Sequence, residues 1–177
     1  MAHIRTIAQM GHPILRQISA SIADLENPAM VSLGADLLET ARHANGVGLA
    51  APQVFESLRM IVIASRPSVR YPHAPELPPV LMINPELLWV SDEQDAGWEG
   101  CLSIPGLRGL VTRHIRTGVS YITVDGKRRE SEYHGFPARV FQHEFDHLQG
   151  KLFIDRLESL NDLVTEQEYQ RRLLEKP

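Results

Sequence analysis

His143-Glu144-Phe145-Asp146-His147 is the pentad from which the rest of the sequence can be interpreted. Residues four apart on an α-helix lie on the same face, so the two imidazoles can point at a single divalent cation. Glu144 projects near enough to move protons at a water on that cation. The pattern also occurs by chance in unrelated chains. It therefore predicts a hydrolytic metal site only if the sequence also supplies a third ligand and a substrate site.

The best candidate for the third ligand is Cys101, within Glu99-Gly100-Cys101-Leu102-Ser103. A thiolate joined to two imidazoles leaves a fourth position for water, which is typical of catalytic sites. Gly100 lets another backbone approach closely. Two alternatives remain open: Cys101 as a small buried apolar residue, and Asp146 as the third ligand. Asp146 lies about 100° around the helix from His147, so we expect it to face away.

The segment Gly46-Val47-Gly48-Leu49-Ala50-Ala51-Pro52-Gln53 is rich in small residues that allow tight backbone approach. Gln53 supplies a neutral amide that can donate to an oxyanion. The alternative is a helix C-cap followed by a packing loop. The two glycines do not form a dinucleotide-binding fingerprint, because they follow a predicted helix and lack the third glycine.

Composition excludes several classes of protein. A formal net charge of −4 and a pI near 6.1 give no overall signal for binding nucleic acid or an anionic membrane. A single cysteine excludes an intrachain disulfide and suits a reducing compartment. The first residues lack the apolar region of a secretory signal, and no segment approaches the roughly 18 apolar residues of a membrane span. We therefore expect a cytoplasmic protein without membrane association.

Two helices are predicted, over 28–43 and 136–148. Asn27-Pro28 offers a capping side chain and a proline in the first turn of the first helix, and Asn45-Gly46 follows its end. The second helix carries the pentad and ends before Gly150. Strands are predicted at 60–64, 80–84, 87–90, 111–113, 119–124 and 152–154, with a hairpin turn at Asp125-Gly126. Residues 65–79 predict a proline-rich loop, and residues 159–175 a helix-prone tail.

The predicted strands lie between helices without βαβ alternation, which favours the α+β class. We expect short antiparallel sheets packed around a central helix that carries the pentad, with one N-terminal and one C-terminal helix. The 177 residues are the size of one domain, so we expect a single domain over 1–177.

Together, Gly46–Gln53, Glu99–Ser103 and Gln142–His147 resemble the three motifs of the peptide deformylases, in the order of that family. The resemblance extends to Gly150 and Leu152–Asp155 and covers nearly the whole chain. It implies a hydrolase that removes the formyl group from the N-terminal formylmethionine of nascent polypeptides and releases formate. Transient docking on ribosomes is compatible with that activity.

The resemblance also implies roles for individual residues. Cys101, His143 and His147 hold the metal, which is Fe²⁺ in the native enzyme, with Zn²⁺, Ni²⁺ or Co²⁺ able to substitute. Glu144 transfers protons, and the formyl oxygen meets the Gln53 amide and the Leu102 backbone N–H. The residues expected to bind the substrate are Val47, Gly48, Gly100, Arg108, Phe136, Arg139 and Val140. Arg113 also matches a family position, as a surface charge or a substrate anchor.

Arg139 departs from the aliphatic residue of many bacterial relatives. The run Ala138–His143 and the proline-rich loop look more like the branch that includes organellar deformylases. Because the chain shows no transit peptide, a bacterial cytosol is the first expectation. One turn before His143, the stem of Arg139 should border the methionine pocket, while its head reaches solvent, a carboxylate or the bound peptide. The alternative is a surface arginine whose methylenes cover the core.

Two rival interpretations remain. A zinc endopeptidase shares the H-E-x-x-H pattern, but Cys101 and the Gln53 segment argue against it. A ribosome-associated binding module would use Arg171, Arg172 and Lys176 of the tail, although neighbouring glutamates also suit a charge-balanced, solvated face. An intact Glu144 argues against pure binding.

Overall fold

The computed structural model describes residues 2–67, 71 and 74–174, and within them it forms two antiparallel sheets with three α-helices. In the five-stranded sheet the order is β1-β2-β3-β6-β7, and in the three-stranded sheet it is β4-β5-β8. The strands are β1 Gly48–Ala50, β2 Met60–Ser65, β3 Leu77–Val90, β4 Gln94–Cys101, β5 Ile104–His114, β6 Arg116–Ile122, β7 Arg128–His134 and β8 Leu163–Thr165. The predicted α+β class is confirmed.

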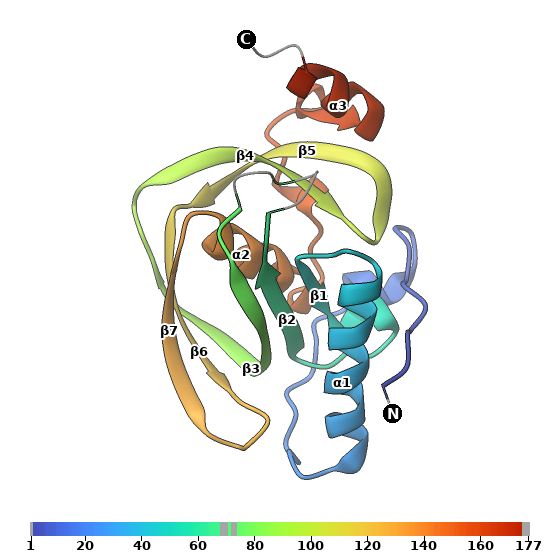
Figure 1. The fold of residues 1–177 in the computed structure, drawn as a ribbon, viewed down its shortest axis with the longest axis vertical. Coiled ribbons are helices and arrows are strands. Elements are labelled where there is room, and N and C mark those ends of the chain that lie inside the picture. The colour runs from blue at the N-terminus through green and yellow to red at the C-terminus, as the bar shows by residue number, and fades with distance from the viewer. Residues whose placement is uncertain (1, 68–70, 72–73, 175–177) are drawn as a thin grey trace.

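Helix α2, Phe136–Leu148, lies behind β1 and β2 and beneath the β4–β5 hairpin (Figure 1). It begins after Gly135, whose φ of 61° favours glycine, and has a proline in its first turn. Its apolar face, with Phe141 and Leu148 fully buried, packs against Ile61 of β2 and Met82 of β3. Each such side chain contributes about 2–3 kcal/mol through burial. The helix that carries the pentad is therefore fixed by its packing against the five-stranded sheet.

Helix α1, Pro28–His43, has the predicted bounds, and the Asn27 side chain accepts a hydrogen bond from the Ala29 N–H. Leu33 and Leu37 face the core, against Leu49 and the beginning of β2. Figure 1 shows α1 beside β1, and α3, Glu166–Leu174, at one end of the molecule next to β5. Within the described residues, no helix has the length and apolar character to span a bilayer.

The predicted strands other than 152–154 are present, with different bounds. Those at 80–84 and 87–90 join into β3, whose pairing with β6 shifts register around Pro85 and Leu88. Asp125-Gly126 forms the turn of the β6–β7 hairpin. The predicted loop 65–79 already enters β3 at Leu77, and residues 68–70, 72 and 73 lie outside the described part.

One expectation for the last third of the chain was wrong. Residues 152–154 do not form a strand, because Phe153–Arg156 is a 3₁₀-helix in which the Asp155 carboxylate accepts from the Leu152 N–H. The helix-prone tail 159–175 contains the expected C-terminal helix, α3, in its second part. A 3₁₀-turn, Leu160–Asp162, leads into β8, which covers the open edge of β5, and α3 follows. Long-range pairing therefore overrides the helical preference of this segment.

Candidate metal centre and active site

Cys101, His143 and His147, the candidate ligand group, each offer one atom that could bind a metal ion, and these three atoms all lie within 4.8 Å of one another. The two histidines stand one turn apart on α2, and Cys101 ends β4. The Cys101 Sγ lies 3.4 Å from the His147 Nε2. Tetrahedral ligation of a zinc-sized ion places a sulfur and a nitrogen ligand about 3.6 Å apart. The spacing and the donor set therefore fit one divalent transition-metal ion.

Glu99 orients the first of these histidines. His143 Nδ1 lies 2.9 Å from the Glu99 Oε2, so an N–H on Nδ1 donates to the carboxylate and Nε2 is left for a metal. Arg113 donates to the same carboxylate from Nε and Nη2, both at 3.0 Å. Burial alone would raise the pKa of Glu99, but Arg113 and His143 hold that pKa well below its usual range. Glu99 is thus a fixed anion that orients the His143 ring.

Asp146 points away from the three ligand atoms, as expected from its place on the helix. Its carboxylate accepts from Arg113 Nη1 at 2.6 Å and from Arg156 Nε at 3.0 Å. Arg113 is therefore neither a surface charge nor a residue of the cavity wall, because it is buried between Glu99 and Asp146. Burial also lowers the pKa of His147 well below its usual range, which keeps this imidazole neutral and able to ligate.

Glu144 is 4% exposed and lines the cavity beside the ligand group. Its Oε2 has no hydrogen-bond partner among the described residues. Burial raises the pKa of Glu144 to about 7. A carboxyl group whose pKa lies near neutral pH suits a role in which it both accepts and releases a proton. Gly48 lies directly against it, since a Cβ there would sit 2.6 Å from the Glu144 Cδ.

Gln53, in the 3₁₀-helix Ala51–Val54, has a fixed amide orientation. Its Oε1 accepts from the Ala50 N–H at 2.8 Å, so its Nε2 must point the other way. Nε2 donates to the Ser103 Oγ at 3.1 Å and lies 3.5 Å from the Cys101 Sγ. This amide donor therefore stands at the edge of the ligand group.

A cavity of about 210 Å³ opens over these groups. All seven residues expected to bind substrate line it, together with Gln53, Cys101, Leu102, His143 and Glu144: they are Val47, Gly48, Gly100, Arg108, Phe136, Arg139 and Val140. His147 is buried and is not part of the lining. The three sequence motifs thus converge on one cavity.

Arg139 is 7% exposed, so the alternative of a solvated surface arginine is wrong. Its Nη1 donates to the Glu99 Oε1 at 3.0 Å and the Val111 carbonyl at 2.7 Å, and its Nη2 donates to the Asp95 Oδ1 at 2.8 Å. The guanidinium therefore reaches carboxylates, which was one of the alternatives expected for it. A Cβ on Gly97 would lie 2.7 Å from the Arg139 Cζ, so that glycine makes room for the guanidinium.

The residues of the cavity wall that the sequence did not indicate include Tyr71, Trp98 and Glu166. Glu166 binds Arg108 across 58 positions of the chain. The one signal that it gave was an acidic residue in a helix-prone tail. Farther along α3, Arg171 and Arg172 both pair with Glu168, which agrees with a charge-balanced face. Lys176 lies outside the described residues.

Comparisons with known proteins point to a single family. The family model for polypeptide deformylase matches residues 4–162. Peptide deformylase 2 of a Nostoc species is 51% identical over 164 residues, which cover 93% of this chain and 92% of that protein. Peptide deformylase 1 of Bordetella pertussis is 44% identical over 89% of each chain.

Solved structures of peptide deformylases are similar to this fold. The class I type b peptide deformylase of Acinetobacter baumannii, crystallised with Met-Ala-Ser bound, gives a TM-score of 0.86 at 45% identity, over 89% of this chain and 100% of that one. Peptide deformylase of Thermotoga maritima gives a TM-score of 0.79 at 38% identity, over 89% and 99% of the two chains.

Proposed function

We propose, because this chain belongs to the polypeptide deformylase family, that its cavity hydrolyses the formyl amide of N-formylmethionyl peptides at a metal ion. The observation that carries this proposal is the convergence of Cys101, His143 and His147 beside the buried Glu144. As a peptide deformylase, the enzyme removes the N-formyl group from nascent peptides. We also propose that the activity depends on a metal and that individual residues have the roles given below.

Cys101, His143 and His147 would hold the metal. A divalent ion in such a site acts as a Lewis acid and lowers the pKa of water. We propose Fe²⁺ as the native ion, with Zn²⁺, Ni²⁺ or Co²⁺ able to substitute, since mixed thiolate and imidazole ligation does not select among them. The fixed tautomer of His143 and the neutral His147 support this ligand set.

Glu144 would carry the proton. It accepts a proton from the attacking water and delivers it to the departing amine, so that the formyl C–N bond breaks into formate and a free methionine N-terminus. Negative charge that develops on the formyl oxygen would meet the Gln53 Nε2 and the Leu102 backbone N–H. The fixed orientation of the Gln53 amide supports the first of these donors.

The methionine side chain would enter the apolar part of the cavity, between Val47, Phe136 and Val140. The peptide backbone would run past Gly48 and Gly100, whose small size allows close approach, as an added strand. That the Acinetobacter relative was crystallised with Met-Ala-Ser, the deformylated form of such a peptide, supports this assignment. Because the enzyme would recognise the backbone of the substrate, the side chains after the methionine would be less restricted.

We propose the cytoplasm as the place of action, because the substrates are nascent chains and the relatives named above are bacterial. Docking on ribosomes through α3 is compatible with this, but the pairing of Arg171 and Arg172 with Glu168 reduces the free positive charge available there.

A matched pair of peptides tests the proposal against a zinc endopeptidase. Formyl-Met-Ala-Ser and acetyl-Met-Ala-Ser are incubated with anaerobically purified enzyme, and formate and peptide fragments are quantified. We expect one formate per formylated peptide, a free Met-Ala-Ser product and no internal fragment. Internal fragments from both peptides, without formate, would identify a protease instead.

A further inference from the structure

Arg108, on β5, holds a buried guanidinium in the wall of the cavity and is 2% exposed. Its Nε donates to the Glu166 Oε2 at 2.6 Å, and its Nη2 donates to the Glu166 Oε1 at 3.3 Å. Its Nη1 donates to the Tyr71 hydroxyl at 2.9 Å. Each of the three guanidinium nitrogens therefore binds a side chain of the protein itself.

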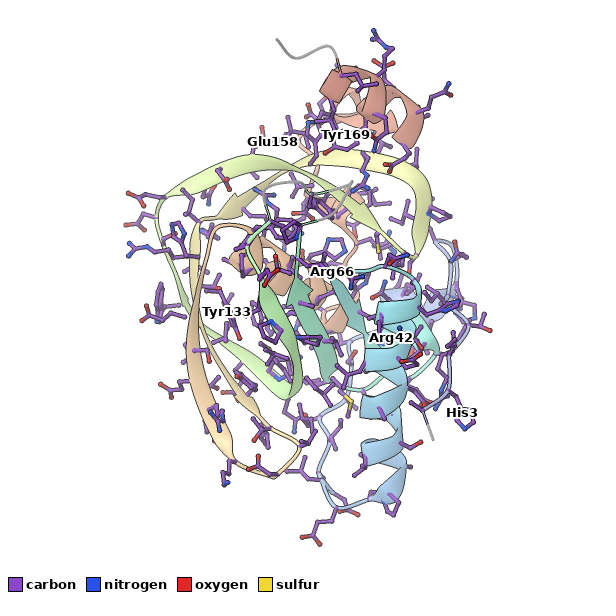
Figure 2. The ribbon with its side chains drawn as sticks, viewed as in Figure 1. His3, Arg42, Arg66, Tyr133, Glu158 and Tyr169 are labelled. Carbon is purple, nitrogen blue, oxygen red and sulfur yellow. The ribbon has the colours of Figure 1, made fainter. Side chains whose placement is uncertain are left out.

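The C-terminal segment β8–α3 supplies the carboxylate of this pair. Pairing of Leu163–Thr165 with Leu107–Gly109 brings the next residue, Glu166, beside Arg108. The Arg108 Cζ lies 5.2 Å from the centre of the Tyr169 ring, which faces β5 from α3 (Figure 2). Tyr169 in turn packs on Trp98, with ring centres 5.5 Å apart. The segment is thus fixed onto the cavity wall from several sides.

This segment lies beyond the stretch matched by the family model, which ends at residue 162. Glu166 is nevertheless part of the cavity lining and is partly exposed there, with 34% of its side chain accessible. Glu166 therefore contributes to the cavity from outside the stretch that the family model matches.

Under the proposed function, the pair would lie along the path of the peptide. A Cβ on Gly100 would sit 2.7 Å from the Arg108 Nη1, so the guanidinium lies against the backbone that would pair with substrate. Tyr71, which binds the other side of Arg108, packs on Phe136 with ring centres 4.7 Å apart. A peptide whose methionine lies near Phe136 would extend its later residues past Arg108 and Glu166.

We propose that Glu166 is a specificity-determining residue that keeps this part of the cavity wall electrically neutral by pairing with Arg108. The inference rests on the proposed function. An arginine side chain stays charged at every accessible pH, so without the carboxylate it would attract acidic residues of the peptide. With the carboxylate in place, acidic and basic residues after the formylmethionine are accepted about equally.

The test compares Glu166→Gln with wild type on formylmethionyl peptides that carry Asp or Lys at the second or third position. We expect an Asp-to-Lys ratio of kcat/KM near one in the wild type. In the variant this ratio should rise about tenfold at one position or both, and the rise should shrink at high salt. Because both peptides are assayed on one preparation, loss of folded or metal-loaded protein cancels from the ratio.

Glu168→Gln is the matched control. It removes the same charge from the same helix, but Glu168 pairs with Arg171 and Arg172 and is not part of the cavity lining. We expect its ratio to stay within about twofold of wild type, as for screened surface charges. In Arg108→Met/Glu166→Gln, the ratio should return toward one, because the unpaired charge is gone.

An unchanged ratio in Glu166→Gln, or an equal change in Glu168→Gln, overturns the inference while formate release continues. A rise that persists in the double variant also overturns it, because the effect would not pass through Arg108. Absence of formate from every formylated peptide with wild-type enzyme would remove the proposed function, and this inference with it.

Discussion

Glu99 illustrates how single residues set the chemistry of this site. One buried carboxylate accepts from Arg113, from Arg139 and from His143. A buried charge is stable only when it is paired and hydrogen-bonded. Two arginines satisfy that requirement, so Glu99 can stay ionised and hold the His143 ring in one orientation. The orientation of His143 therefore depends on residues that are not in the candidate ligand group.

Replacement of Glu144 by Gln tests proton transfer. Glutamine keeps the size of the side chain but cannot accept a proton from water, so kcat should fall by about 10²–10⁴. The metal content should remain that of wild type, because Glu144 is not in the ligand group. Metal analysis and formate release are measured on the same preparation. A near-normal kcat at full metal content would assign proton transfer to another group.

Replacement of Arg139 by Leu tests the buried network. It removes the donor from Arg139 to the Val111 carbonyl and one of the two donors to the Glu99 Oε1. Loss of one partner of a buried pair costs about 3 kcal/mol in the free energy of unfolding. The expected result in a urea titration is a lower midpoint, with an altered KM for formylmethionyl peptides because Arg139 lines the cavity. If both quantities stay at wild-type values, Arg139 has no role in the network or in binding.

At the scale of elements, close contacts between segments position the reactive groups. Gly48 of β1 lies against Glu144 of α2, and any side chain there would overlap the carboxylate. The small residues of the Gly46–Gln53 segment thus allow a strand and a helix to approach closely enough to share one cavity.

Gly48→Ala follows from that contact. The added methyl group should push the Glu144 carboxylate aside and lower kcat by about 10²-fold, the range for a displaced catalytic group. Metal content should not change, since the ligand residues lie elsewhere on α2 and β4. Steady-state formate release beside metal analysis checks this. A variant with wild-type kcat would show that Glu144 tolerates displacement.

Local signals explain which elements were predictable. Asn27-Pro28 and the glycines at 135 and 150 define the ends of α1 and α2 within the sequence itself, so both helices have their predicted bounds.

The strand β7 was missed because its charged residues lie on an exposed edge and show no apolar alternation. β8 depends on the open edge of β5, about 55 residues earlier. The proximity of His143 and His147 was predictable from helical spacing, whereas the place of Glu166 was not, because only this pairing brings it to the cavity.

At the scale of the whole molecule, the ligand group joins two parts of the fold. Cys101 comes from the three-stranded sheet, and the two histidines come from the helix that packs on the five-stranded sheet. A metal bound here links these parts, so metal binding and stability should be coupled.

Removal of the metal tests this link. A ligand present at 1,000 times its Kd stabilises the folded state by about 4 kcal/mol, and each kcal/mol shifts the Tm of a domain of this size by about 2–4 °C. We expect chelation to lower the Tm of wild type by about 10 °C and to leave Cys101→Ala unchanged. An equal shift in both proteins would mean that the chelator acts somewhere else.

X-ray absorption spectroscopy at the metal edge, on anaerobically purified wild-type protein, tests the central claim most directly. The account predicts one sulfur at about 2.3 Å and two imidazole nitrogens at about 2.0–2.1 Å, and loss of the sulfur scatterer in Cys101→Ser. A metal shell without sulfur in the wild-type enzyme, while formate release is normal, would contradict the account.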